Sequence, residues 1–188
     1  MKEKYPWSPP PISPEAKLDK CQKWLWGYLA VVVKAIKEKY GEEGLSVIFN
    51  AAKEHYKKLT IADAKRLGIP TETGSLKDVV TLFDAADDIL FTMKKKRVVS
   101  EVPTENTPER LLYSIQECNV AETIADICPY VCPVVSRAAE QGCAEVINPN
   151  IKIAGNRYLA FGDHACDIYI ELKRLPQKEV VDYHRCEV

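Results

Sequence analysis

The apolar positions of this chain follow a helical spacing up to about residue 93 and an alternating, strand-like spacing from about residue 95. The first predicted helix runs from Pro14 to about Tyr40, with Ser13 as its cap and Gly41 as its end. Its apolar stripe consists of Leu18, Cys21, Leu25, Tyr28, Val32, Ala35 and Ile36. Trp24, Trp26 and Val33 widen that stripe, so we expect burial on more than one side, either in a homodimer through residues 14–40 or at the centre of the core.

Three further helices are predicted before the change of period. One covers 42–59, a short one begins at Thr60 and stops at Gly68, and one runs from Ser75 to about 93. Ser75 and Asp78 have the spacing of a capping box.

The second half of the chain predicts a small antiparallel sheet. Valine-rich 97–102 and alternating 111–116 form one expected hairpin, and two strands within 148–175 form another around the turn 162–165. After that turn, the apolar side chains Cys166, Ile168, Ile170 and Leu172 point to one face. The expected fold class is therefore α+β, with a Cys/Pro-rich helical segment between the two hairpins.

We expect one domain over 14–188, preceded by an extended proline-rich arm at 1–13. Helices take up about 14–93, the sheet-bearing half about 94–175, and a tail 176–188.

Composition narrows the expected partners. The 188 residues carry a formal net charge of -1, which gives no electrostatic reason to expect nucleic acid. The longest apolar run, Trp24 to Val33, is too short to span a bilayer, so no membrane partner is expected. An odd number of cysteines, seven, behind an N-terminus that does not resemble a signal peptide favours free thiols in the cytoplasm.

The cysteine-rich segment 118–143 contains the strongest candidate for a reactive thiol. Cys128 and Cys132 each precede a proline, which predicts that both lie at turns. Cys132 would cap a helix that begins at Pro133 and stops at Gly142, where backbone N–H groups favour a thiolate and lower the thiol pKa. The alternative is that these cysteines are small buried apolar residues.

A zinc site is a second reading of the same segment. If it meets the turn 162–165 in space, three or four ligands could come from a pool of His164 and four cysteines, Cys118, Cys128, Cys132 and Cys166.

The chain resembles the L-2-amino-thiazoline-4-carboxylic acid hydrolase family over roughly residues 20–174. The resemblance is carried by KYGEEGLSVIFNAAKEH, by SIQEC ending at Cys118, by NPNIKI and by the closing GDHACDIYI. The closing motif is shared with the wider group of 4-vinyl-reductase-like ligand-binding domains. The resemblance implies a small hydrolase that opens a cyclic aminothiazoline to N-carbamoyl-cysteine.

Such a reaction needs an attacking group, a proton donor for the departing sulfur and a cation for the carboxylate. We expect either direct attack by Cys132 or attack by hydroxide on a cysteine-bound zinc. His164 or Asp163 would move the proton, and Arg157 or Arg137 would hold the carboxylate.

Two other classes of function compete with this hydrolase. One is a non-catalytic domain that binds an apolar small molecule or a metal, and the other is a partner-binding protein that uses the proline-rich arm and the tryptophan-bearing helix. Polar groups that meet the cysteines at one pocket would favour the enzyme. A closed, wholly apolar cavity would favour the binder, and a large exposed tryptophan patch the partner-binding protein.

Overall fold

The computed structural model describes residues 12–90 and 95–173, so the predicted arm at 1–13 falls almost entirely outside it, as does the tail 176–188. The described elements confirm the α+β class: long helical segments come first and one four-stranded antiparallel sheet follows. The strands are β1 (Lys95–Val99), β2 (Arg110–Cys118), β3 (Ile151–Arg157) and β4 (Cys166–Leu172), and they lie in the order β1-β2-β4-β3. The two expected hairpin pairs, β1 with β2 and β3 with β4, are both present.

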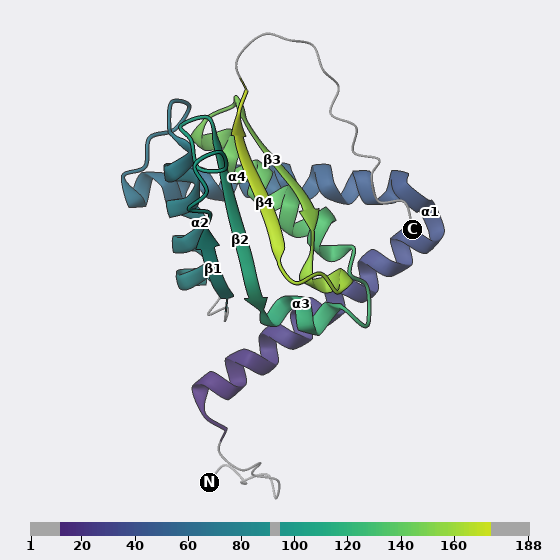
Figure 1. Cartoon of the computed structure of the whole chain (residues 1–188). Coiled ribbons are helices and arrows are strands. Elements are labelled where there is room, and N and C mark those ends of the chain that lie inside the picture. Colours follow the sequence, from purple (N-terminus) through teal and green to yellow (C-terminus); the bar gives the residue numbers. More distant parts are fainter. Residues whose placement is uncertain (1–11, 91–94, 174–188) are drawn as a thin grey trace, which may run out of the picture.

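Helix α1 (Pro14–Leu67) contains a break where the sequence predicts one. Gly41 adopts φ 60°, a left-handed conformation that favours glycine, and it divides the helix into two straight parts (Figure 1). At the start, the Ser13 hydroxyl accepts a hydrogen bond from the Ala16 amide, and Gly68 closes the end with φ 67°.

The predicted helix start at Thr60 is wrong, because α1 continues through that position to Leu67. Thr60 is buried, and its hydroxyl lies 3.0 Å from the Cys143 sulfur of helix α4 (Arg137–Ile147). The hydroxyl therefore bonds across to a packed neighbour and does not cap a new helix.

Helix α2 (Leu76–Leu90) begins as predicted. The Ser75 hydroxyl accepts a hydrogen bond from the Asp78 amide, while an Asp78 carboxylate oxygen accepts one from the Ser75 amide at 2.7 Å. This reciprocal pair satisfies two amides that the first helical turn would leave without partners.

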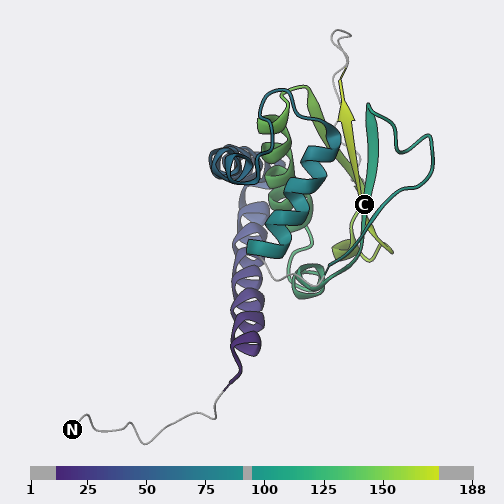
Figure 2. The same cartoon turned by 90° about the vertical axis from the view of Figure 1, so that its left-hand side faces the viewer.

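The helices cover one face of the sheet in layers. Helix α4 packs on β3 and α1 packs on α4, while α2 lies beside α4 on the same side of the sheet (Figure 2). Gly142 allows the close approach of α1 and α4, since a Cβ atom there would come within 2.5 Å of the Lys53 carbonyl oxygen. The prediction that Gly142 ends its helix is therefore wrong: the glycine is a contact point and α4 continues to Ile147.

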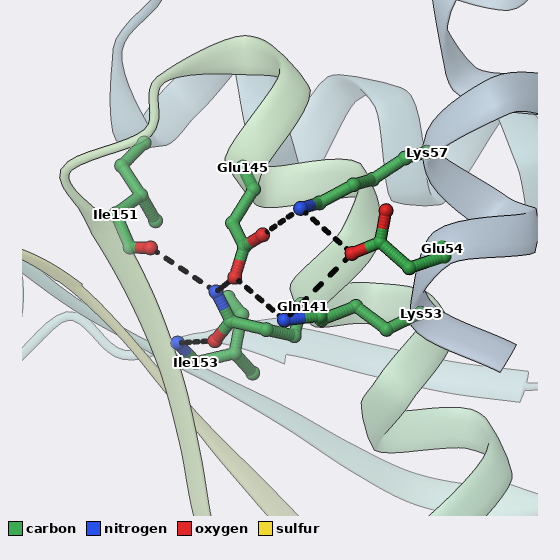
Figure 3. A network of polar contacts seen from close by, with 7 residues as sticks. All are labelled: Lys53, Glu54, Lys57, Gln141, Glu145, Ile151 and Ile153. Carbon is green, nitrogen blue, oxygen red and sulfur yellow. Dashed lines mark hydrogen bonds and ion pairs between the residues drawn. The ribbon is translucent and has the colours of Figure 1, made fainter. Parts of the chain in front are cut away.

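A polar network joins α1, α4 and the outer strand β3 (Figure 3). The buried Gln141 side chain donates to the Ile151 carbonyl at 3.3 Å and accepts from the Ile153 amide at 2.8 Å. These are edge-strand groups that no neighbouring strand would satisfy. On the other side Gln141 donates to Glu145 at 3.0 Å, and Glu145 is ion-paired to Lys57 and Lys53 of α1.

The inward face of the sheet forms the core together with α1 and α4. In β4 the predicted inward positions Cys166, Ile168 and Ile170 are buried and Leu172 is half-buried. Asp167, predicted on the opposite face, is buried as well. None of the described helices combines the length and the apolar character that a bilayer crossing demands.

Candidate functional site

A cavity of about 50 Å³ lies where the sheet meets four helical segments. It is walled by α1, β2, β4, helix α3 (Asn119–Ile124), the π-helical turn Cys132–Ser136 (η1), the start of α4, and Tyr158. Its lining consists of Trp26, Ile115, Cys118, Val120, Ala121, Cys132, Ser136, Arg137, Glu140, Tyr158, Cys166 and Ile168. Three thiols and one charged pair therefore face a mostly apolar space.

The π-helical turn sets the relative position of the first two polar groups. In η1 the Arg137 amide bonds to the Cys132 carbonyl, five residues back, where a regular α-helix would bond four back. Pro133, which has no amide hydrogen, occupies the second position of this turn. The wider turn places the Cys132 thiol and the Arg137 side chain in the lining of one cavity. Turns of this kind occur often at functional sites.

The guanidinium group of Arg137 is held by three neighbours, Glu140, Tyr158 and Gly155. The Arg137 side chain is ion-paired to Glu140 one turn along α4, and its guanidinium carbon lies 5.3 Å from the centre of the Tyr158 ring. Behind it, a Cβ atom at Gly155 of β3 would come within 2.5 Å of an Arg137 terminal nitrogen, so a larger residue there would displace the guanidinium group. Although burial alone lowers the pKa of Arg137, the charge of Glu140 and the contact with Tyr158 outweigh it and raise the pKa. The guanidinium therefore stays charged inside the fold.

One donor of this buried group has no partner. Arg137 is only 7% exposed, and its Nε atom makes no hydrogen bond within the described structure. A buried charged donor without an acceptor costs free energy, which the oxygen of an ordered water or of a ligand would recover.

The cysteines divide into two groups. Cys118, Cys132 and Cys166 line the cavity, whereas Cys128 is buried but lies outside the lining. Cys118 ends β2 and precedes α3, and Cys166 begins β4, where its sulfur accepts a hydrogen bond from the Leu159 amide at 3.3 Å. Among the residues of 12–90 and 95–173, no three or more His, Cys, Asp or Glu side chains are grouped as a metal site would need. A zinc site stays a prediction.

The prediction of a lowered thiol pKa at Cys132 is wrong. Cys132 is the first residue inside the π-helical turn and does not stand outside it as a cap. Burial, followed by the neighbouring Cys166 and Cys118, raises the pKa of the Cys132 thiol well above its usual range, and the charge of Arg137 only partly opposes this. Burial also raises the pKa of Cys166. Both thiols are thus protonated at neutral pH.

This protonation predicts a pH dependence of stability. A raised folded-state pKa means that the thiol's contribution is fully present below the unfolded value near pH 9 and is lost as the pH rises beyond it. We expect Cys132→Ala to remove that loss, so the difference in unfolding free energy between wild type and variant should shrink by up to about 1.4 kcal/mol from pH 9 to pH 10. Urea unfolding at pH 7, 9 and 10 measures it. Val135→Ala, which shortens a buried side chain of the same turn that does not titrate, is the control, and a pH-independent difference for Cys132→Ala would contradict the assignment.

The structure places the predicted proton carriers and one predicted arginine away from this cavity. Asp163 and His164 are exposed at the turn before β4. The Asp163 carboxylate accepts from the Tyr158 amide at 2.8 Å and shapes the turn, while His164 lies 3.0 Å from Arg157. Arg157 is 42% exposed and pairs with Asp167. Of the two candidate carboxylate clamps, Arg137 alone reaches the cavity.

Glu140, Tyr158, Gly155 and Trp26 complete the site and were not expected from the sequence. A charged Arg137-x-x-Glu140 pair in an otherwise apolar helix start is the one local signal that could have indicated them.

Comparison with known proteins finds solved structures with a similar fold. No protein-family model matches the chain, and no curated protein sequence matches it either. Solved structures do match. One is a trafficking protein particle complex subunit 3 from Naegleria fowleri, covalently bound to palmitic acid, with a TM-score of 0.57 over 85% of this chain and 99% of that one. The likeness is one of fold. At 11% identity it carries no further statement about this chain.

Proposed function

We propose that this protein binds a compact organic acid in the cavity and holds the acid's carboxylate on Arg137. The observation that carries this proposal is the buried Arg137 side chain in the cavity lining, whose Nε atom makes no hydrogen bond. A guanidinium group matches a carboxylate through two parallel hydrogen bonds. The apolar lining from Trp26, Ile115 and Ile168 would cover the body of the ligand.

The cavity size favours a compact ligand. About 50 Å³ holds an acid group and a few attached atoms, whereas drug-sized pockets run to several hundred Å³, so even the ring of an aminothiazoline acid would press the walls apart. The long acyl chain of palmitic acid, which the similar trafficking subunit carries, would require the walls to separate.

Hydrolysis of that acid is the reaction we propose, as the family resemblance implies. What favours catalysis over binding alone is that polar and titratable groups, Glu140 and three thiols, meet Arg137 at one cavity. Water would add to the amidine carbon of an aminothiazoline, the carbon–sulfur bond would break, and the sulfur would leave with a proton. If Cys132 attacked in place of water, a base would first have to remove the thiol proton, and the Glu140 carboxylate is the base within the lining. That proton would pass to the ring sulfur as the carbon–sulfur bond breaks, and water would then cleave the new bond to Cys132 and release the product.

The proposed setting is the cytoplasm. There the free thiols of the described residues would stay reduced.

Ligand binding is tested by calorimetric titration with L-2-amino-2-thiazoline-4-carboxylate, and hydrolysis by mass-spectrometric detection of N-carbamoyl-cysteine. We expect Arg137→Gln to weaken binding by about ten- to a hundredfold, the worth of one charge-assisted hydrogen bond. Arg157→Gln is the matched control, since it removes a surface arginine and should leave binding unchanged.

Arg137→Lys keeps the positive charge but cannot form the two parallel hydrogen bonds to a carboxylate. Weaker binding by a folded Arg137→Lys variant would therefore reflect loss of these hydrogen bonds and not loss of the fold. Circular dichroism should show both Arg137 variants folded. Wild-type protein that neither binds nor turns over this acid or smaller carboxylates would overturn the proposal. Binding without product would leave a carrier in place of an enzyme.

A further inference from the structure

The first part of α1 extends beyond the body of the molecule and exposes an apolar stripe. In both views the helix start runs away from the sheet and the other helices, past α3 (Figures 1 and 2). Trp24 is 71% exposed and Tyr28 60%, and their rings stack on each other at 5.8 Å. Leu18, Cys21, Leu25 and Val31 are exposed on the same stretch.

This stripe is separate from the face that α1 buries. Trp26, Ala30 and Val33 are buried against the body, and Trp26 also lines the cavity. The exposed residues lie on the other side of the same helix. We predicted that this helix is buried on more than one side. Within a single chain, only the side that carries Trp26 is buried.

The spacing of the exposed stripe is that of a coiled-coil seam. Its residues alternate three and four apart, as the a and d positions of a heptad do: Leu18, Cys21, Leu25, Tyr28, Val32 and Ala35. Trp24 and Val31 flank the seam on one side, at g positions, together with Lys17 and Glu38. A seam of this spacing fits another helix laid along it.

We propose that a second copy of this chain covers the seam as an antiparallel helix, with the two-fold axis near residues 26 and 27. In this arrangement Leu25 of one copy packs against Tyr28 of the other, and Cys21 lies opposite Val32 of the other. The seam is self-complementary, as a two-fold interface requires.

The flanking residues favour the antiparallel direction. Antiparallel packing brings g positions together, so Lys17 of each copy meets Glu38 of the other, and Trp24 meets Val31. Lys17 and Glu38 are both exposed in the single chain. Parallel packing would set Lys17 beside the uncharged Gln22 and would give no ion pair.

The area available is sufficient for a dimer. Fully covering two aromatic side chains such as Trp24 and Tyr28 removes roughly 300 Å² from water per copy. With Leu18, Leu25 and Val31 the two copies together would bury on the order of 1,000 Å², the lower limit for a specific interface. The inference is independent of the proposed function because the seam faces away from the cavity.

The full chain tests the dimer by sedimentation velocity. We expect a species of twice 21.2 kDa at micromolar concentration, and Leu25→Glu should shift it to a single chain mass. Lys34→Glu, at an exposed position of the same helix outside the seam, should leave the dimer intact. A wild-type monomer at tens of micromolar would overturn the proposal, whether the seam is then covered by another protein or by another part of the chain.

Two sets of variants test the direction of the helices: charge exchanges and cysteine substitutions. Lys17→Glu or Glu38→Lys alone should weaken the dimer severalfold, and the double exchange should restore it. Under mild oxidation, Val32→Cys should form an intermolecular disulfide with Cys21, and Cys21→Ser should abolish it. A Cys21–Cys21 disulfide in the wild-type chain would contradict the antiparallel arrangement.

Discussion

Replacing Gly142 by valine should destabilise the protein by several kcal/mol. Even a Cβ atom at this position would lie 2.5 Å from the backbone oxygen of Lys53 and 3.3 Å from the Lys57 amide nitrogen, so α1 and α4 would have to separate. Backbone cannot rotate away as the tip of a side chain can, which puts the cost at or above the roughly 1–3 kcal/mol typical of overpacking. Urea denaturation measures the change.

A second glycine in a helix supplies the control for that experiment. Gly27 lies within α1, and a Cβ atom there would meet only the Ile127 side chain at an ordinary 3.7 Å. Gly27→Ala should therefore stabilise the protein by up to about 1 kcal/mol, because alanine restricts the unfolded chain and favours helix. Equal effects of Gly142→Ala and Gly27→Ala would show that the interhelical contact has no special tightness.

Gln141→Leu should cost about 2–4 kcal/mol. The substitution leaves the Ile153 amide and the Ile151 carbonyl of the edge strand buried without their side-chain partner, and each such loss costs about 1–3 kcal/mol. It also removes the hydrogen bond to Glu145 that links this strand to the lysines of α1. Leucine keeps the volume and the helix propensity, so the loss reports on polar partners.

Gln141→Glu distinguishes the acceptor role of the side-chain amide from its donor role. A carboxylate still accepts from the Ile153 amide but cannot donate to Ile151, and it lies close to the negative charge of Glu145. We expect it to be at least as destabilising at pH 7 and to improve as the pH is lowered toward 4, where carboxylates gain protons. Amide hydrogen exchange at Ile153 measures the strand directly, and unchanged protection in Gln141→Leu would refute the role assigned to this side chain.

Local signals in the sequence predicted the elements well. Ser13 with Pro14, Gly41, and the Ser75–Asp78 pair are short-range patterns whose physics is contained within a few residues, and each lies where it was expected. The alternation in β4 predicted its buried face for the same reason. The predicted helix start at Thr60 and helix end at Gly142 were wrong because the partners of these residues, Cys143 and Lys53, are distant in sequence and close in space.

The candidate site was only partly predictable. Proximity in sequence suggested that Asp163, His164 and Cys166 would act together, but Cys166 turns into the core as the first residue of β4 while the preceding turn faces water. Chemical reasoning alone selected Arg137 and Cys132, and both line the cavity. Their neighbours Tyr158 and Glu140 depend on how β3 and α4 pack, which no local pattern records.

The single extra residue in the turn Cys132–Ser136 has a consequence for how this architecture could arise or be lost. Each residue turns a helix by about 100°, so deleting one from this turn would convert it to a regular helix and swing the thiol away from the guanidinium. Chains with this fold but without the extra residue would keep the hydrophobic core, but different side chains would line the cavity. A one-codon change in length would thus alter which groups line the cavity while the fold stays the same.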